Sequence, residues 1–197
     1  MEDRLRFRQI HLDFHTSELI KDIALGFEPE KFAKTLKDAH VNSITCFARC
    51  HHGMIYYDSK VNKERIHPYL CDKDLLKKQI DACHKYDIKV PVYTTVQWDM
   101  YTAIRHPEWL VRKPDGSIEG EYFNKDGFYQ RICVNTPYKD FLKKHVREFV
   151  SELDCDGVFF DIVSEMDCSC TYCMNSMLEK GLDPLVEDDR ITHYKSV

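Results

Sequence analysis

Three residues near the start of the chain alternate in a pattern that suits a binding site. His11, Asp13 and His15 occupy every second position of R-Q-I-H-L-D-F-H-T, and alternate residues of a β-strand point to the same face of a sheet. Imidazole and carboxylate groups on one face can coordinate a metal ion or bind a polar substrate. They can also form the solvent-exposed face of a strand that has no binding role. His11 lies roughly 7 Å deeper along the strand than Asp13. We therefore expect His11 to support the interior, while Asp13 and His15 reach the ligand.

Further polar and aromatic residues follow the later apolar segments. His51 and His52 come after the segment 41–49, Trp98 follows I-K-V-P-V-Y-T-T-V-Q, and Asp161 ends the apolar run D-G-V-F-F-D. Such groups suit a neutral, hydroxyl-rich ligand, because aromatic faces stack on sugars while imidazoles and carboxylates bind hydroxyls. Asp161 would then be the nucleophile of a retaining glycosidase, whose two carboxyl groups lie about 5 Å apart. The structural alternatives are a loop cap for Asp161, a buried hydrogen-bonded member of the histidine pair, and core filling by Trp98.

The chain has nine cysteines among 197 residues. An odd number without a secretory signal favours reduced thiols over disulfides. Cys168, Cys170 and Cys173 form C-S-C-T-Y-C, a spacing that presents several sulfurs to a tetrahedral zinc ion; the alternative is a reduced cysteine-rich turn at a helix start. The candidates for a fourth ligand are Asp167 and His193. The six scattered cysteines are predicted to be small core residues: Cys46, Cys50, Cys71, Cys83, Cys133 and Cys155.

Predicted strands and helices alternate along the chain. Strands are expected at 8–15, 41–49, 88–97 and 156–163, and helices at 29–40, 72–86, 138–153 and 173–180. The near-continuous apolar run of the fourth strand predicts cover on both of its faces. The segment 98–137 is too long to lack structure, and we expect it to fold back as a hairpin around Asp115-Gly116.

This alternation predicts parallel strands joined by right-handed crossovers. Short apolar strands with enlarged loops at their C-terminal ends favour an α/β fold of the (β/α)8 TIM-barrel type, which ordinarily needs ~250 residues. The sequence holds four strand–helix units, so we expect residues 1–197 to form a single, partial barrel domain. A flavodoxin-like open parallel sheet is the alternative, although no glycine-rich phosphate loop follows any strand.

Composition and charge narrow the class of protein. Hydrophobic residues make up 43% of the chain and aromatic residues 12%, which fits a packed globular core. A net charge of −5 gives no electrostatic case for nucleic acid or an anionic membrane as a partner. No apolar run has the length of a membrane span, and the N-terminus lacks the apolar core of a signal peptide. The expected location is therefore cytoplasmic.

Several of these segments resemble the α-L-fucosidase clan. I-T-C-F-A-R-C-H-H-G-M-I-Y-Y-D-S-K-V is similar to the clan's strand with its His-His-Asp-Gly-Phe segment and Ser-Lys pair. V-Y-T-T-V-Q-W resembles its Tyr-x-Ser strand ending in tryptophan, and D-G-V-F-F-D-I resembles its nucleophile strand. With H-L-D-F-H-T and H-P-E-W-L, these motifs resemble a family of glycosyl hydrolases related to those fucosidases, with a barrel catalytic domain, over residues 8–173.

The resemblance implies roles for individual residues. Asp161 matches the nucleophile of the clan. The side chains that match its sugar-binding groups are His15, His51, His52 and Trp98, and Asp13 and Tyr93 complete the predicted substrate-binding set. The Asp between His-His and Gly is missing in this chain, and Cys50 stands where the clan carries lysine. The proton donor of the clan lies beyond the fourth strand, so that Glu165 is only the nearest candidate.

Three functions stay open on the sequence. The first is a retaining, α-L-fucosidase-like glycoside hydrolase that needs no cofactor for catalysis. As half a barrel it would leave strand edges open, and would need a missing C-terminal half or a partner copy besides its carbohydrate substrate. The second is a metal-dependent hydrolase of the amidohydrolase type, suggested by H-x-D-x-H, which needs further ligands on later strands. The third is a non-catalytic carbohydrate-binding or vestigial barrel module. A structural zinc ion at the cysteines of C-S-C-T-Y-C is compatible with the glycoside hydrolase function.

Overall fold

The computed structural model describes residues 5–120 and 130–196 of the chain. Its contacts divide the chain into two compact units. Unit 1 comprises Met1–Cys50, Met54–Thr94 and Lys144–Asp161, and unit 2 comprises His51–Gly53, Thr95–Lys143 and Ile162–Val197. None of the described helices is long and apolar enough to cross a membrane.

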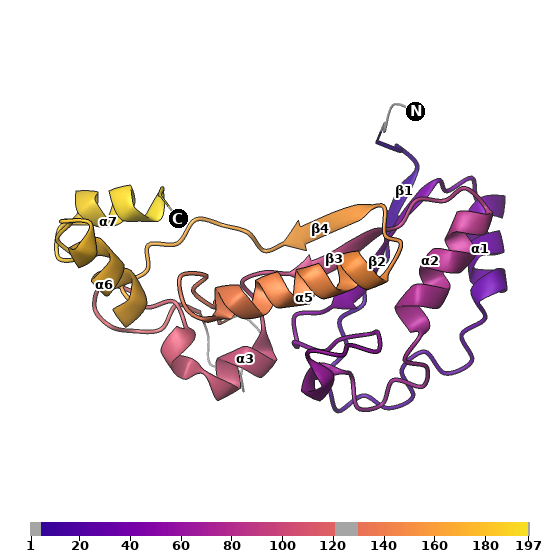
Figure 1. Cartoon of the computed structure of the whole chain (residues 1–197), viewed down its shortest axis with the longest axis horizontal. Helices are drawn as coiled ribbons and strands as arrows, with labels where there is room; N and C mark the ends of the chain where they lie inside the picture. Colours follow the sequence, from indigo (N-terminus) through magenta and orange to yellow (C-terminus); the bar gives the residue numbers. More distant parts are fainter. Residues whose placement is uncertain (1–4, 121–129, 197) are drawn as a thin grey trace. The chain divides into compact units, whose positions relative to one another are not determined.

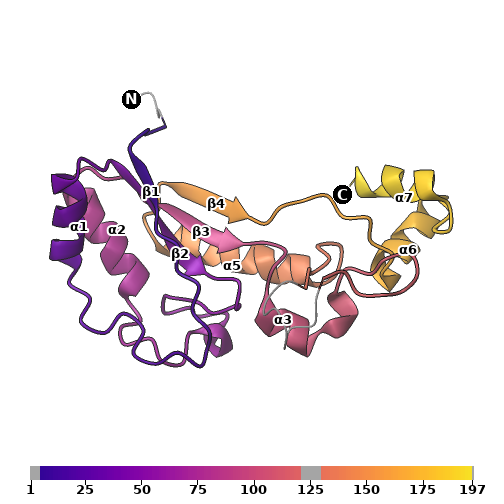
Figure 2. The same ribbon diagram turned by 180° about the vertical axis from the view of Figure 1, so that it is seen from behind.

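The α-helices and β-strands of both units are labelled in Figures 1 and 2. Unit 1 contains β1 (Gln9–His11), α1 (Pro29–Asp38), β2 (Ser43–Arg49), the 3₁₀ turn η1 (Lys63–Arg65), α2 (Leu75–Lys85), β3 (Pro91–Thr95), most of α5 (Tyr138–Glu152) and β4 (Gly157–Asp161). Unit 2 contains α3 (Met100–Arg105), the 3₁₀ turn η2 (Pro107–Trp109), the start of α5, α6 (Thr171–Glu179) and α7 (Glu187–Tyr194). All predicted strands and helices are confirmed in type and order, with shorter bounds for the strands.

The four strands form one parallel sheet in the order β1-β2-β3-β4. Gln9 of β1 lies opposite Ser43 of β2, and Cys46 of β2 lies opposite Val92 of β3. In a flavodoxin-like sheet the chain changes direction and the strand order begins 2-1-3. An order that simply follows the sequence is that of successive β/α units of a barrel. The predicted barrel-type fold is therefore confirmed as a partial barrel, and the strand order excludes the open-sheet alternative.

One face of the sheet is covered by helices, and the opposite face carries aromatic residues. The core on the covered face is formed by Ala33 and Leu36 of α1, Ile44, Cys46 and Ala48 of β2, Leu76, Ile80, Ala82 and Cys83 of α2, Ile88, Val90 and Val92 at β3, and Phe149 of α5. Because alternate strand residues point to opposite faces, Phe47 and Tyr93 lie on the other face. In a barrel that face is the interior, where the strands deliver their site residues.

The strand β4 corrects one expectation. Its apolar run predicts cover on both faces, yet Phe159 is 41% exposed and Phe160 is 51% exposed. The reason is that β4 is the last strand of the sheet, so in the part of the chain that the structure describes it has a strand neighbour on one side only.

The predicted hairpin around Asp115-Gly116 is present. Arg112 pairs in antiparallel fashion with Ile118, and Gly116 at the turn has a φ of +82°. Residues 121–129 lie outside the described residues. The rest of the long segment after Trp98 contains α3 and η2, so it does have structure of its own.

Glu148 on α5 anchors the loop that follows β2. Its carboxylate accepts hydrogen bonds from the Tyr57 hydroxyl (2.9 Å), the Ser59 hydroxyl (2.7 Å) and the backbone amides of Lys60 (2.5 Å) and Val61 (3.1 Å). Burial acts to raise the pKa of Glu148, but the hydrogen bonds together outweigh it and hold that pKa below its usual range. The loop bearing the Ser-Lys pair is thereby fixed to the outer helix.

We expect Glu148→Ala to lower the free energy of unfolding by about 2–4 kcal/mol, because it leaves several donors without their charged acceptor. The matched control is Glu152→Ala at the exposed end of the same helix, for which about 0.5 kcal/mol or less is expected. Since the folded-state pKa is lowered, the stabilisation is present above the ordinary glutamate pKa of about 4.3 and is lost as the pH falls through the folded-state value. Urea unfolding followed by circular dichroism measures both variants, and equal losses would contradict the anchoring role.

Candidate functional site

Asp161 is held at the C-terminal end of β4 by its neighbour on β3. Its Oδ2 accepts a 2.7 Å hydrogen bond from the hydroxyl of Tyr93. Tyr93 is fully buried, and burial raises its pKa far above the usual value, with a further contribution from the hydrogen bond to Asp161. The phenol therefore stays protonated and acts as a fixed donor. It orients the carboxylate at the end of the sheet where barrel enzymes place their reacting groups.

Aromatic rings form a continuous layer on this face of the sheet. Phe47 and Tyr93 stack with ring centroids 3.7 Å apart, and Phe159 stacks on Tyr93 at 5.9 Å. The imidazole of His11 packs against all three rings at centroid distances of 5.3–5.5 Å. His11 is thus a member of the layer that supports the strand ends.

His15 and Asp13 form a pair just beyond the end of β1. His15 Nε2 lies 2.9 Å from Asp13 Oδ1, and the imidazole meets the rings of Phe47 and Tyr93 edge-on at 5.1 Å and 5.8 Å. Burial lowers the pKa of His15, and the charges of Asp13 and Asp161 oppose that effect in part. At neutral pH the imidazole is therefore uncharged, and such a group exchanges hydrogen bonds with a hydroxyl while a carboxylate orients it.

The H-x-D-x-H segment does not gather into a metal-binding set. His11 Nε2 lies 3.9 Å and His15 Nε2 lies 2.9 Å from Asp13 Oδ1, but the ligand atoms of these three residues do not all lie within 4.8 Å of one another. Among the residues that the structure describes, one group of His, Cys, Asp or Glu brings at least three ligand atoms together. It consists of Cys133, Cys168, Cys170 and Cys173, whose sulfur atoms lie within 4.8 Å of one another.

The histidine pair belongs to unit 2 and contacts Trp98. The rings of His51 and Trp98 meet edge-on at 4.9 Å. His51 Nδ1 lies 2.9 Å from the Thr95 hydroxyl, which donates to the Trp98 carbonyl at 2.9 Å. His51 is buried, whereas His52 and Trp98 are half-buried. The pair therefore has one deeply placed, hydrogen-bonded member and one more accessible member.

Gly53 lets the histidine turn approach α3 closely. Its φ is +83°, and a Cβ at this position would lie 2.5 Å from Asp99 Oδ1 and 2.6 Å from Tyr101 Cβ. The amide of Tyr101 donates to the His52 carbonyl at 3.2 Å. Asp99 is itself the side-chain cap of α3, so glycine is required at position 53 to seat the turn on the helix start.

The predicted substrate residues fall into two groups. Asp13, His15, Tyr93 and Asp161 belong to unit 1, and His51, His52 and Trp98 belong to unit 2. Those of unit 1 gather at one face of the sheet through the Tyr93–Asp161 hydrogen bond, the Asp13–His15 pair and the ring contacts of His15 with Tyr93. That both groups line one sugar pocket stays a prediction.

Cys133 is predicted to be a small core residue and is buried as predicted, and it also joins the other three cysteines in one group. Its Sγ lies 3.5 Å from that of Cys173. Asp167 and His193, the expected candidates for a fourth ligand, are not members of the cysteine group. Spacing gave no signal for Cys133, because α5 and β4 separate it from the other three in sequence.

All nine cysteines are free thiols. Of the five outside the group, Cys46, Cys50 and Cys83 are buried as predicted, Cys155 is half-buried, and Cys71 is exposed, contrary to prediction.

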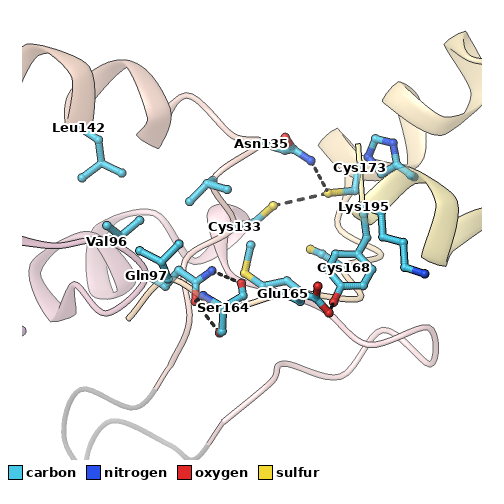
Figure 3. A pocket seen from close by; sticks show the side chains of 15 residues that line it. Val96, Gln97, Cys133, Asn135, Leu142, Ser164, Glu165, Cys168, Cys173 and Lys195 are labelled. Atoms are coloured by element: carbon cyan, nitrogen blue, oxygen red, sulfur yellow. Dashed lines mark hydrogen bonds between the residues drawn. The ribbon is translucent and has the colours of Figure 1, made fainter. Parts of the chain in front are cut away.

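Glu165, the nearest candidate for a proton donor, lies beside a cavity of unit 2. The cavity has a volume of about 520 Å³ and is lined by Gln97, Ser164, Glu165 and Cys168 among others (Figure 3). Glu165 is exposed and accepts a hydrogen bond from the hydroxyl of Tyr194. Gln97 holds the start of this loop, since its Oε1 accepts from the Ser164 hydroxyl at 2.9 Å.

Comparison with known proteins gives one family and several similar structures. The sequence model of the family described as hypothetical glycosyl hydrolase 6 matches residues 28–162. Alpha-L-fucosidase isoenzyme 2 from Paenibacillus thiaminolyticus is 45% identical with a TM-score of 0.90, over 98% of this chain and 29% of that one. This chain thus spans less than a third of that fucosidase. No curated protein matches the chain.

Two more distant structures share the fold only. Alpha-L-fucosidase isoenzyme 1 from Paenibacillus thiaminolyticus is 19% identical with a TM-score of 0.55, over 84% of this chain and 38% of that one. A hypothetical protein from Ruminiclostridium thermocellum ATCC 27405 is 16% identical with a TM-score of 0.53, over 68% of each chain.

Proposed function

Because this chain belongs to the family described as hypothetical glycosyl hydrolase 6, we propose that it carries the nucleophile of a retaining glycoside hydrolase, Asp161. The observation that supports this most directly is the hydrogen bond from buried Tyr93 to Asp161 at the C-terminal end of β4. A carboxylate placed there and held in one orientation is what attack on an anomeric carbon requires. A carboxylate that only capped a loop would need no such buried phenol.

In this mechanism Asp161 attacks the anomeric carbon and the glycosidic oxygen leaves with the bonding electrons and a proton. Water then cleaves the resulting glycosyl ester, so that the anomeric configuration is retained. Asp13 and His15 hold sugar hydroxyls, and the partly exposed ring of Phe159 offers an aromatic face to the C–H side of the sugar. The proton donor is not assigned to a residue of this chain.

The substrate class we propose is an α-L-fucoside. Its support is the 45% identity to a protein named alpha-L-fucosidase isoenzyme 2 across nearly this whole chain. We further propose that the active form contains more β/α units than the four of this chain. Parallel sheets are buried on both faces in complete proteins, whereas Phe159 and Phe160 of β4 are exposed at the sheet edge.

The test compares aryl α-L-fucosides with good and poor leaving groups. A nitrophenolate leaves without protonation, so the activated substrate reports on the nucleophile even where a proton donor is absent. The assay uses this chain alone and a chimera in which it replaces the matching segment of isoenzyme 2. We expect hydrolysis that is indifferent to a chelator of catalytic metals, with the α-anomer formed first by NMR. A β-anomer formed first would contradict a retaining mechanism, and fucose binding without turnover in the chimera would favour a non-catalytic module.

Tyr93→Phe is expected to lower kcat by about 10- to 100-fold with little change in KM. A hydrogen bond to a charged group contributes about 1.5–3 kcal/mol, and each 1.36 kcal/mol of barrier corresponds to a factor of ten in rate. Tyr69→Phe, at an exposed tyrosine of the same unit, is the matched control and should leave kcat unchanged. Steady-state kinetics on the chimera measure both, and equal rates for the two variants would remove Tyr93 from the mechanism.

A further inference from the structure

Four buried cysteines gather in unit 2. Cys133, Cys168, Cys170 and Cys173 are at most 5% exposed, and their sulfur atoms all lie within 4.8 Å of one another. Figure 3 shows Cys133 and Cys173 pointing toward one another from the segment before α5 and from α6, with Cys168 beside them. The cluster takes no part in the glycosidase mechanism proposed above.

The spacing of the sulfurs fits a single tetrahedral ion. Zinc–sulfur bonds of about 2.3 Å place the sulfurs of a tetrahedron about 3.8 Å apart. The sulfur atoms of Cys133 and Cys173 lie 3.5 Å apart. A disulfide would bring two sulfurs to about 2.05 Å, and an iron–sulfur cluster is bulkier than one ion. Four thiols without an ion would form only weak S–H hydrogen bonds with one another, and these would add little to the free energy of unfolding.

A helix N-terminus and N–H donors face the sulfur atoms. Cys170 is the N-cap of α6 and Cys173 lies in its first turn, where the helix dipole favours negative charge. The Asn135 side-chain amide donates to Cys173 Sγ at 3.4 Å, and the Cys170 amide donates to Cys168 Sγ at 3.5 Å. Donors directed at ligand atoms are the usual second layer of a metal site. Asn135 comes from the same turn as Cys133, so this turn supplies both a sulfur and a supporting donor.

The apolar core around the cysteines is small. Apart from the four cysteines its buried members are Val111 and Met177, with Met166, Met174 and Leu182 partly buried against them. Small cores of this kind are commonly reinforced by a structural metal. The turn at Cys133 is tied to η2, since the Cys133 amide donates to the Trp109 carbonyl at 2.8 Å, and it is closed by the hydrogen bond from the Thr136 hydroxyl to the Cys133 carbonyl at 2.7 Å.

We propose that Cys133, Cys168, Cys170 and Cys173 bind one zinc ion that fastens the segment before α5 to the start of α6. All four coordination positions are filled by protein sulfur, which makes the site structural and not catalytic. Binding forms four Zn–S bonds and releases the protons of the thiols that ionise, with no change of oxidation state. The site is independent of the proposed glycosidase function and would exist in an inactive protein.

The first test is metal content. The full chain, produced with zinc in the medium and purified under reducing conditions without chelator, is expected to contain about one zinc per chain by mass spectrometry of the elements. Cys133→Ser should lose most of that zinc, although it leaves the C-x-C-x-x-C motif intact. Cys155→Ser, a half-buried cysteine outside the group, should keep it. Wild-type protein without zinc, stoichiometric iron in its place, or full zinc in Cys133→Ser would each overturn the proposal.

A second test does not depend on whether Cys133→Ser folds. Cobalt added to the metal-free chain should give the intense visible bands of a tetrahedral ion and a sulfur-to-cobalt charge-transfer band. Cys133→His keeps a ligand at that position, and should bind cobalt with a weaker charge-transfer band because one sulfur is replaced. Octahedral-type weak bands, an unchanged spectrum in Cys133→His, or a Cys133–Cys173 disulfide found by peptide mapping of the purified protein would contradict a four-sulfur site.

Discussion

Replacing Asp161 by asparagine is expected to lower kcat for an activated aryl α-L-fucoside by about 10³- to 10⁵-fold, which is roughly 4–7 kcal/mol of barrier. Asparagine has the shape of aspartate and still accepts the hydrogen bond from Tyr93, so the fold and the binding of sugar should be kept. It cannot form the glycosyl ester, however, because the amide is a poor nucleophile. The loss should therefore appear in kcat, with KM changed by only a few-fold.

The matched control is Asp154→Asn, at an exposed carboxylate before the start of β4. It changes the net charge by the same amount and should leave kcat unaltered. Asp161→Gly gives a second readout, since a small anion such as azide can occupy the space of the lost carboxylate. We expect azide to restore turnover and to form the β-fucosyl azide by direct displacement. If Asp161→Asn keeps more than a tenth of the activity in the chimera, the nucleophile is another residue.

The position of Asp161 could be predicted from sequence because it depends on local pattern. An apolar run that ends in a carboxylate predicts a strand with a polar end, and the parallel order of the units predicts that Tyr93 and Asp161 lie on neighbouring strands. A hydrogen bond between them is then expected, because both side chains point to the same face of the sheet from adjacent positions. The same reasoning predicted that His15 lies near this face. The strand β1 ends at His11, earlier than expected, and the segment after β1 forms the Asp13–His15 pair.

The sequence does not predict the role of a residue when that role depends on contacts with residues far away in the chain. Cys133 has no regular spacing to the C-x-C-x-x-C motif, and only the return of the chain after α5 and β4 brings the two together. From its spacing in the helix, Glu148 is expected to be an ordinary surface residue. In the structure its carboxylate accepts several hydrogen bonds from the loop after β2. The exposure of Phe159 and Phe160 is likewise a property of the sheet edge and not of the apolar run itself.

Removal of the proposed zinc is expected to loosen unit 2 selectively. Structural zinc sites have apparent binding free energies of about 10–16 kcal/mol near neutral pH, which is comparable to the whole stability of a small domain. Because the apolar core around the cysteines is small, little else would hold the turn at Cys133 to α6. Unit 1 has its own larger core built on β2, β3, α1 and α2 and should keep its structure.

Hydrogen exchange measured by mass spectrometry separates the two units. After treatment with a strong zinc chelator, peptides covering residues 130–137 and 168–179 should exchange at least about tenfold faster. Peptides from α1 and α2 should be unchanged, and zinc, but not magnesium, should reverse the effect, because magnesium prefers oxygen ligands. Cys155→Ser should respond to the chelator as the wild type does. Faster exchange spread evenly over both units would mean that the ion supports the fold as a whole, and unchanged exchange at both segments would mean that the four sulfurs hold no stabilising ion.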